Sequence, residues 1–348
     1  MARLAIQADR IGLAPADRAD FSGRWLQLAA ERGIETLVVD VRAPGFIDQV
    51  ADCDAFLWRF GARRENVDLA KKLLPALEQG LNVPVFPAYG QTWWAEDKLA
   101  QHFLLRAARL PYPDSWLFWD ASAARRFCDT ATYPLVLKLA SGFGSANVAL
   151  LHNRAEAEYW IGELFGQGVR RLEQAVPSWL ARRRRQASTV MRMLRRRDDF
   201  REQGYFFVQE FLPDNAFDTR VTVIGRRVFA FRRRNRPDDF RASGSGNIDW
   251  DPRAVAPEAV RLGFTVAQRL KTQVVAVDVM RRGSDYIATE LNFSFRAGAI
   301  DACPGHWSFD DGGTQGPWHD GPVRAADAIF DDVLTQLDLR AAARTRAD

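Results

Sequence analysis

The chain has 348 residues, of which 47% are apolar, and it carries a formal net charge of +4. Such a chain can bury roughly two or three cores of ordinary domain size, which indicates a globular protein. No stretch approaches the about 18 consecutive apolar residues of a membrane span, so an integral membrane protein is not expected.

The N-terminus and the cysteines favour a cytoplasmic protein. The opening residues MARLAIQADRIG lack the long apolar segment and the cleavage site of a signal peptide. Cys53, Cys128 and Cys303 lie far apart and in no metal-ligand spacing. They argue against a disulfide framework or a zinc site, and we expect each to be a small apolar residue.

Residues 1–90 alternate short apolar strands with helical stretches. The strands are LAIQA (4–8), TLVVDV (36–41), AFLWRF (55–60) and VPVFPA (83–88), and the helices lie around 19–31 and 66–79. This rhythm predicts a small parallel α/β domain. No Gly-x-Gly-x-x-Gly follows the first strand, so nothing marks a dinucleotide-binding domain.

Residues 91–204 begin with an amphipathic helix within 95–113, with Leu99, Phe103 and Ala107 at i, i+4 spacing. Strands near 135–140 and 147–151 and a helix at 154–166 follow. A basic stretch at 178–203 then carries Arg182 to Arg185, Arg192 and Arg195 to Arg197. It is either a solvated helical or mobile insertion or a patch for phosphate, nucleic acid or an anionic membrane surface. Such a patch could also draw an acidic substrate towards the site. Aromatic residues do not interleave with the arginines, so nucleic acid is not an expected partner.

Residues 205–340 are rich in strands. The expected elements are a strand at 205–212, a hairpin at 220–234, a helix at 254–270, strands at 274–280 and 285–293, and a helix at 323–337.

Asp278, Glu290 and Asn292 carry the strongest chemical signal. Their two β-branched strands are joined by RRGS, which predicts a hairpin. Because side chains alternate faces along a strand, Glu290 and Asn292 point the same way and Asp278 can face them from the partner strand. Two carboxylates and an amide oxygen suit Mg²⁺, so the hairpin predicts a magnesium-nucleotide site. The alternative is a solvated hairpin edge with scattered acids.

A second candidate site lies in YPLVLKLASGFGSANVAL. Lys138 ends an apolar strand, and the loop after it is rich in Gly and Ser. Backbone N–H groups of such a loop can fold over a polyphosphate while the lysine supplies positive charge. The candidate loop residues are Ser141, Gly142, Gly144 and Ser145. Lys98 is another candidate phosphate ligand; a plain hairpin turn and a solvated surface lysine are the alternatives.

The string QEFLPDNAFDTRVTVIG supplies nucleoside contacts. Backbone groups at the end of its apolar strand could pair with the adenine edge, with apolar side chains on the ring; the residues are Gln209, Glu210, Phe211 and Leu212. Asp218 can accept hydrogen bonds from ribose hydroxyls, and Arg220 points to the same side.

Two further arginines, Arg233 and Arg241, can clamp a transferring phosphoryl group. Arg232 or Arg234 could take the place of Arg233, since a shift of one residue flips the face.

In this order and spacing, these motifs resemble the ATP-grasp enzymes over roughly 91–300, and most of all the branch with glutathione synthetase and the ribosomal-protein glutamate ligase. The resemblance implies an α/β chain with the ATP-grasp fold, α+β in its nucleotide-binding part. A parallel pre-ATP-grasp domain would span 1–90. A first subdomain (91–204) would carry the lid loop at 141–147 and the insertion at 178–203, and a second subdomain (205–340) would carry the metal site.

The resemblance also implies roles for the residues. Lys98 and Lys138 would bind the phosphates of ATP. Glu210 and Leu212 would contact adenine, and Asp218 would hold the ribose. The γ-phosphate, the acyl phosphate or the substrate carboxylate would meet Arg220, Arg233 and Arg241. Two Mg²⁺ ions, for which Mn²⁺ can substitute, would be held by Asp278, Glu290 and Asn292.

The chain departs from the family pattern in three places. Ala146 and Asn147 stand where many relatives have a further glycine, and Ser243 stands where many have Asn. After Glu-x-Asn the chain reads FSFRAGAIDACPGHW in place of a nearby Pro-Gly turn. The acceptor side is therefore its own, and its specificity does not follow from glutathione synthetase.

We expect an ATP-dependent carboxylate–amine ligase that forms an amide through an acyl phosphate and releases ADP and phosphate. The expected partners are small-molecule or peptide carboxylates and amines, acidic ones included, and a second copy of the chain in a homodimer. One alternative is a small-molecule kinase of the same fold that phosphorylates a hydroxyl. Another is a non-catalytic nucleotide- or polyanion-binding protein.

Overall fold

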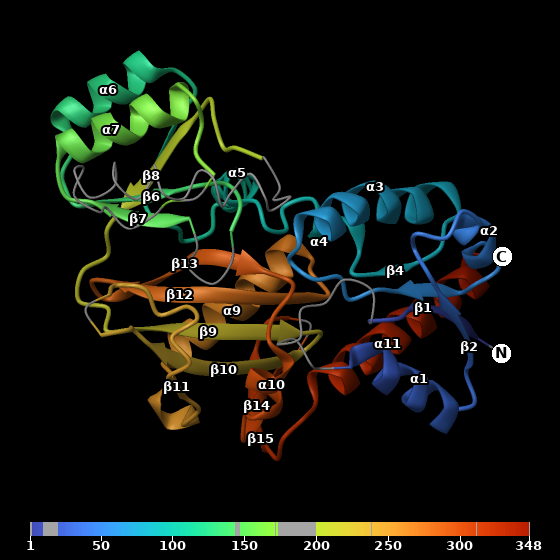
Figure 1. Cartoon of the computed structure of the whole chain (residues 1–348). Coiled ribbons are helices and arrows are strands. Elements are labelled where there is room, and N and C mark those ends of the chain that lie inside the picture. The colour runs from blue at the N-terminus through green and yellow to red at the C-terminus, as the bar shows by residue number, and fades with distance from the viewer. Residues whose placement is uncertain are drawn as a thin grey trace. The chain divides into compact units, whose positions relative to one another are not determined.

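A computed structural model describes residues 2–9, 20–142, 147–170, 172, 200–237, 239–310 and 312–347, and the side chains of the last helix as far as 338. The chain forms two compact units. Unit 1 comprises Met1–Glu96, Phe103–Tyr112 and Asn215–Asp348, and unit 2 comprises Asp97–His102 and Pro113–Asp214. Figure 1 labels the elements of both. The division into the segments 1–90, 91–204 and 205–340 stays a prediction.

The N-terminal part of unit 1 is a parallel sheet with the strand order β2-β1-β3-β4. Its strands are β1 (Arg3–Gln7), β2 (Glu35–Val39), β3 (Ala55–Leu57) and β4 (Val85–Phe86). The accompanying helices are α1 (Phe21–Glu31), α2 (Phe46–Val50), α3 (Arg64–Gly80) and α4 (Tyr89–Thr92). The predicted parallel α/β domain is confirmed.

The rest of unit 1 is built on an antiparallel sheet with the order β13-β12-β9-β10-β14-β15, and β11 pairs with β10. Its strands are β9 (Phe217–Ile224), β10 (Arg227–Arg234), β11 (Ile248–Asp249), β12 (Val274–Arg282), β13 (Asp285–Asn292), β14 (Gly305–Phe309) and β15 (Gln315–Asp320). The helices are α9 (Pro257–Leu270), α10 (Ala297–Asp301), α11 (Ala325–Ala347) and a 3₁₀ turn at Pro252–Ala254.

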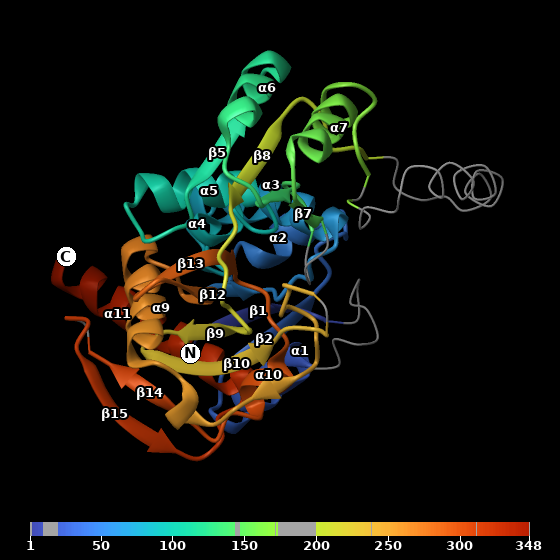
Figure 2. The same ribbon diagram turned by 90° about the vertical axis from the view of Figure 1, so that its left-hand side faces the viewer.

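Helix α9 covers one face of this sheet, where it packs against β9, β12 and β13 (Figure 2). The approach is close at Gly263, because a Cβ added there would lie 2.3 Å from Cγ1 of Val221. Val221 pairs with Val277, so both valines lie on the α9 face. Side chains at the alternate positions Arg220 and Asp278 therefore lie on the opposite face.

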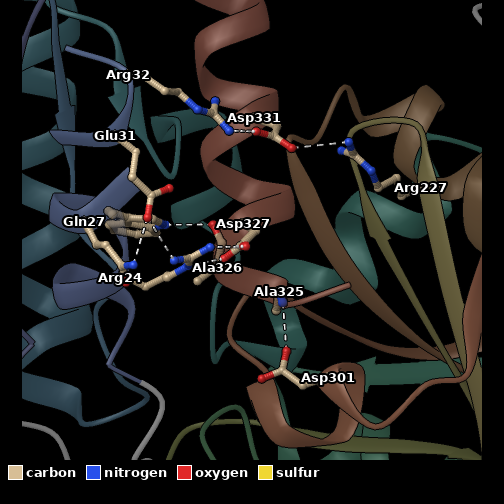
Figure 3. A network of polar contacts seen from close by, with 11 residues as sticks. Arg24, Gln27, Glu31, Arg32, Arg227, Asp301, Ala325, Ala326, Asp327 and Asp331 are labelled. Carbon is tan, nitrogen blue, oxygen red and sulfur yellow. Dashed lines mark hydrogen bonds and ion pairs between the residues drawn. The ribbon is translucent and has the colours of Figure 1, made fainter. Parts of the chain in front are cut away.

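Helix α11 joins the two parts of unit 1. Arg24 of α1 holds Asp327 at 2.6 Å, and Trp25 donates from Nε1 to the carbonyl of Ala326. Asp331 pairs with both Arg32 of α1 (2.6 Å) and Arg227 of β10 (3.4 Å), as Figure 3 shows. The shared core beneath these contacts includes Trp25 and Phe330, so α1 and the antiparallel sheet pack on one helix.

Unit 2 is a four-stranded sheet with the order β5-β8-β6-β7. Its elements are β5 (Ser115–Phe118), α6 (Ala121–Thr130), β6 (Leu135–Lys138), β7 (Val148–Leu151), α7 (Arg154–Phe165) and β8 (Phe206–Glu210). Asn153 caps α7 by accepting from the N–H of Glu156, whose carboxylate accepts in turn from the N–H of His152. The core lies between the sheet and its two helices, with Leu137, Ile161 and Phe206 fully buried.

The predicted apolar face of the first helix of residues 91–204 is wrong. That helix is α5 (Lys98–Ala107), and Phe103 is 51% exposed. Lys98, Gln101 and His102 are instead buried. The spacing of apolar residues identified the helix but not its buried side. The buried side carries Lys98, Gln101 and His102, whose polar groups have interaction partners in the fold.

Strands β14 and β15 have no counterpart among the predicted elements. β15 contains Gly316 and Pro317, and it is the edge strand of the sheet, where a missing N–H costs no ladder hydrogen bond. The three cysteines are buried and free, as expected. Of the described helices, none has the length and apolar character needed to cross a membrane. The insertion predicted at 178–203 lies outside the described residues up to 199.

Candidate active site

Four neighbouring strands of unit 1 place ionisable side chains in one row. Asp278 of β12 lies opposite Glu290 of β13 on one side and opposite Arg220 of β9 on the other. Arg233 of β10 lies opposite Asp218, two residues before Arg220 on β9. Because paired residues share a face, and residues two apart on a strand do too, all five point to the face opposite α9.

A β-bulge brings Glu290 onto this face. From the turn to the pair Val279–Ala288 the hairpin keeps one register, and the register shifts at Asp278 so that Thr289 is left over. If the register near the turn continued unchanged along the same sequence, Asp278 would face Thr289, and Glu290 would lie on the α9 side beside Val277. The hydroxyl of Thr289 donates to the carbonyl of Asp278 (3.1 Å). The bulge therefore decides that Asp278 and Glu290 meet.

Asp278 lies between two guanidinium groups. Arg220 donates to both of its carboxylate oxygens, through Nε and, at 2.9 Å, through Nη2, and Arg233 Nη2 lies 2.8 Å from Oδ2. The residue is 4% exposed. Burial acts to raise the pKa of Asp278, but the two guanidiniums outweigh it and hold that pKa below its usual range. Asp278 is therefore a carboxylate at neutral pH.

Asp218 is the second partner of Arg233. Arg233 donates from Nε to Oδ1 (2.7 Å) and from Nη2 to Oδ2 (2.5 Å). Burial raises the pKa of Asp218 against the attraction of Arg233, and Asp278 adds a like charge. Burial opposes the charge of Arg233 as well, but Asp278 and Asp218 together raise its pKa, so it stays a cation. Both oxygens of Asp218 face a guanidinium, and the predicted ribose contact stays a prediction.

Of the three consecutive arginines that end β10, Arg233 is the one on this face. Arg232 pairs with Asp249 at 2.5 Å, and Arg234 lies 3.7 Å from the same carboxylate. Arg233 also donates to Oγ of Ser243 at 3.4 Å, at the position where relatives often have Asn. The face that the sequence left open is thus settled by the strand register.

Arg241 lies outside the row of paired strand residues. It donates from its main-chain N–H and its guanidinium to Asp239, two residues earlier, at 2.7–3.0 Å. Hydrogen bonds from Arg241 are the main reason that the pKa of Asp239 is lowered. Its predicted contact with phosphate or substrate stays a prediction.

The donor set at the hairpin fits Mg²⁺. Asp278 and Glu290 are opposed carboxylates, and Asn292, two residues beyond Glu290 on β13, adds an amide oxygen on the same face. Glu290 and Asn292 are half-buried, so they remain reachable from solvent. Within the described residues, no cluster of three or more His, Cys, Asp or Glu side chains is placed to hold a metal ion.

The predicted phosphate ligands lie in unit 2. Lys138 is the last residue of β6 and is 9% exposed, and Lys98 is the first residue of α5 and is 5% exposed. Lys98 donates from Nζ to the carbonyl of Gly142 (2.6 Å), and its N–H donates to the carbonyl of Ala140. Gly142 has φ 125°, which favours glycine. Gly144 and Ser145 lie outside the described residues.

Two further contacts at the base of this loop were not predicted from the sequence. Ser141 donates to the carboxylate of Glu202, and Ala140 donates to the hydroxyl of Tyr205. Asn147 has φ 63°, a left-handed conformation that Asn tolerates, at the position where relatives have glycine. In the sequence, Glu202 is one acidic residue after several arginines, and this pattern alone suggests a charged side chain in solvent.

The predicted adenine segment begins at the end of β8. The side chain of Gln209 donates to Oγ of Ser115 (3.0 Å), and the carboxylate of Glu210 accepts from the N–H of Asp114 (2.9 Å). Phe211 and Leu212 follow the strand, and Leu212 is 7% exposed. Both polar side chains are thus engaged with the start of β5, which leaves main-chain groups as the predicted adenine contacts.

Comparisons with known proteins show what the chain is similar to. A family model described as the RimK-like ATP-grasp domain matches residues 173–303. A probable alpha-L-glutamate ligase of Cellvibrio japonicus (strain Ueda107) is 23% identical over 297 residues, which cover 81% of this chain and 86% of that protein.

Two solved structures show the same fold over nearly the whole chain. One is a RimK domain ATP-grasp protein from Sphaerobacter thermophilus, with a TM-score of 0.53 and 21% identity, covering 96% of this chain and 100% of that one. The other is the D-alanine–D-alanine ligase from Bacillus anthracis complexed with ATP, with a TM-score of 0.56 and 11% identity, covering 99% of each chain. The predicted ATP-grasp fold is confirmed. The chain therefore has the ATP-grasp fold and resembles the RimK-like branch of the ATP-grasp ligases.

Proposed function

We propose that this protein is an ATP-dependent carboxylate–amine ligase that forms an amide or peptide-like bond through an acyl phosphate. The observation that carries the proposal is the row in which Arg233, Arg220, Asp278 and Glu290 share one face of the antiparallel sheet. Carboxylates beside fixed guanidiniums suit phosphoryl transfer, whose transition state needs positioning and charge neutralisation more than a covalent catalyst. Two of the proteins named above carry the name of a ligase, a probable alpha-L-glutamate ligase and a D-alanine–D-alanine ligase, which favours the same reaction class here.

In the first step, a carboxylate oxygen of the substrate attacks the γ-phosphorus of ATP. The bond from that phosphorus to the β,γ-bridging oxygen breaks, and ADP leaves with the electron pair. Arg220 and Arg233 would neutralise charge on the transferred group, and the bidentate contact of Asp218 keeps Arg233 in one orientation. Asp278, Glu290 and Asn292 would hold Mg²⁺, which supplies positive charge to the phosphate oxygens when bound.

In the second step, the amine attacks the carbonyl carbon of the acyl phosphate, phosphate leaves, and the nitrogen loses a proton to water. Lys98, Lys138 and the main chain at Ser141 and Gly142 would hold the phosphates of ATP. The main chain of 209–212 would hold adenine. The proposal also includes Asp218 as the ribose ligand and two metal ions, for which Mn²⁺ can substitute. It further includes a homodimer, a cytoplasmic location and an acidic substrate.

Trapping with hydroxylamine tests the reaction. The protein is incubated with MgATP, hydroxylamine and panels of amino-acid and peptide carboxylates, and ADP and hydroxamates are measured. We expect an acid-dependent hydroxamate, because hydroxylamine intercepts an acyl phosphate. A stable phosphate ester without any hydroxamate would identify a kinase instead, and MgATP that neither binds nor turns over would indicate a non-catalytic protein.

The matched variants are Glu290→Gln and Glu258→Gln. Glu258 lies on α9 and pairs with Arg261 at the surface (2.7 Å, side chains 57% and 53% exposed). Glu290→Gln should abolish hydroxamate formation and keep the fold, whereas Glu258→Gln should retain activity. Full activity of Glu290→Gln would remove this residue from the proposed metal site.

A further inference from the structure

Glu202 lies near the end of the arginine-rich stretch at 178–203. Its side chain contacts Ser141, at the base of the glycine-containing loop of unit 2. Its Oε1 accepts from the N–H (3.1 Å) and the hydroxyl (2.5 Å) of Ser141. Its Oε2 accepts from the hydroxyl of Tyr205 (2.8 Å), and that hydroxyl accepts from the N–H of Ala140 (2.8 Å). One carboxylate thus holds two consecutive residues at the start of the loop, one directly and one through Tyr205.

The carboxylate is built into the fold. Glu202 is 4% exposed, and its main chain forms a two-way bridge with Val169, both hydrogen bonds being 2.8 Å. Tyr205 is also 4% exposed, and burial, followed by the charge of Glu202, raises its pKa, so the hydroxyl stays a donor. A buried carboxylate is costly without donors, and here three donors satisfy it.

The same residues are tied to the proposed phosphate ligands. Lys98 donates to the carbonyl of Gly142, next to Ser141, and the side chain of Asn147 donates to the carbonyl of Ser141 (2.9 Å). The N–H of Leu139, which follows Lys138 on the chain, donates to the carbonyl of Asn147 (3.0 Å). Both described ends of the loop therefore meet at Ser141, whose position Glu202 determines.

We propose that Glu202 is a positioning residue for the phosphates of ATP, acting through Ser141 and Tyr205 on the described residues 140–142. The inference rests on the proposed function, since it assumes that this loop binds the phosphates. In this proposal Glu202 does not touch the nucleotide itself. Its two carboxylate oxygens already accept hydrogen bonds from three donors, and an exposed carboxylate at this place would repel a polyphosphate. Glu202 acts on the geometry of the main chain at Ala140 and Ser141. Its replacement should therefore weaken the binding of the phosphates and leave the binding of the adenosine moiety unchanged.

The test compares the binding of MgATP and of adenosine by calorimetry. Glu202→Gln keeps the size of the side chain but replaces the charge and one acceptor. We expect MgATP to bind about tenfold more weakly, the equivalent of one lost charge-assisted hydrogen bond, and adenosine to bind as before. Tyr205→Phe removes the hydroxyl that links Glu202 to Ala140, and with it one of the three donors to Glu202, but it leaves the contacts of Ser141 in place. It should weaken MgATP binding in the same selective way but less. Glu158→Gln, in an exposed pair with Arg125 (2.7 Å), is the matched control and should change neither affinity.

The outcomes separate the inference from the proposed function. Wild-type protein that binds no MgATP refutes the proposed function. Wild-type binding with unchanged MgATP affinity in both variants overturns the inference alone. An equal loss of MgATP and adenosine affinity, with a lower unfolding midpoint, shows a purely structural role and overturns it as well. If Glu202→Gln does not fold, Tyr205→Phe decides between the same outcomes.

Discussion

The substitution Asp218→Asn distinguishes two roles for this residue. The side chain is 7% exposed and both its oxygens accept from Arg233, so the change removes one charge from a buried pair without altering its shape. Removing one partner of a buried ion pair costs about 3–5 kcal/mol. Arg233 keeps Asp278 at 2.8 Å, and burial raises the pKa of Asp218, so the fold does not favour its charge. The expected loss therefore lies below that range, about 1–2 kcal/mol, and comes from the amide donor that Asn turns towards Arg233.

Urea unfolding is the assay, with Asp68→Asn as control. Asp68 pairs with Arg64 on α3 at 3.3 Å, with side chains 49% and 45% exposed, so its loss should cost less than about 1 kcal/mol. If Asp218 acts by holding Arg233, the variant is destabilised and turnover falls, while the affinity for MgADP is retained below the unfolding transition. MgADP is the probe because it carries the ribose but not the γ-phosphate.

The opposite pattern would refute this reasoning. A variant as stable as the control, with weakened binding of both MgADP and adenosine, would show that Asp218 binds the ribose, as the sequence predicted. The paired geometry with Arg233 would then be a resting arrangement that nucleotide binding replaces.

Three further changes test other parts of the molecule. Lys138→Met keeps the stem without the charge, so calorimetry should show MgATP binding about tenfold weaker or more; unchanged affinity would remove the loop from the phosphate site. Deleting Thr289 removes the unpaired residue and leaves Glu290 opposite Asp278, so the deletion variant and Thr289→Ala should both keep MgATP turnover; a folded deletion variant without turnover would contradict the register argument. Burial raises the pKa of Asp332 from 3.8 to about 6, so the folded state keeps a proton that the unfolded chain loses and stability falls as pH rises across that interval. Asp332→Asn should therefore be more stable than wild type at pH 7, by up to about 3 kcal/mol, and similar at pH 4; equal pH profiles in urea unfolding would contradict this.

Local pattern in the sequence was sufficient for most elements and for the kind of residues at the site. The alternation of apolar strands and helices in residues 1–90 predicts a parallel sheet. Two parallel neighbouring strands need a long crossover connection, and the helix between them supplies it. Period-two alternation likewise predicts that Glu290 and Asn292 share a face, and carboxylates with an amide indicate a hard cation. Each of these depends only on residues that are close in the chain.

Only the tertiary structure decided how distant residues meet. A regular hairpin joined at Gly283 and Ser284 would put Asp278 and Glu290 on opposite faces, and the bulge at Thr289 reverses this. Strand register likewise selected Arg233 among three arginines and gave it two carboxylate partners. Glu202 was not among the predicted site residues, yet the fold buries it at the base of the loop. These outcomes depend on pairing between separate strands and on which polar groups find partners when buried, and neither is encoded in local spacing.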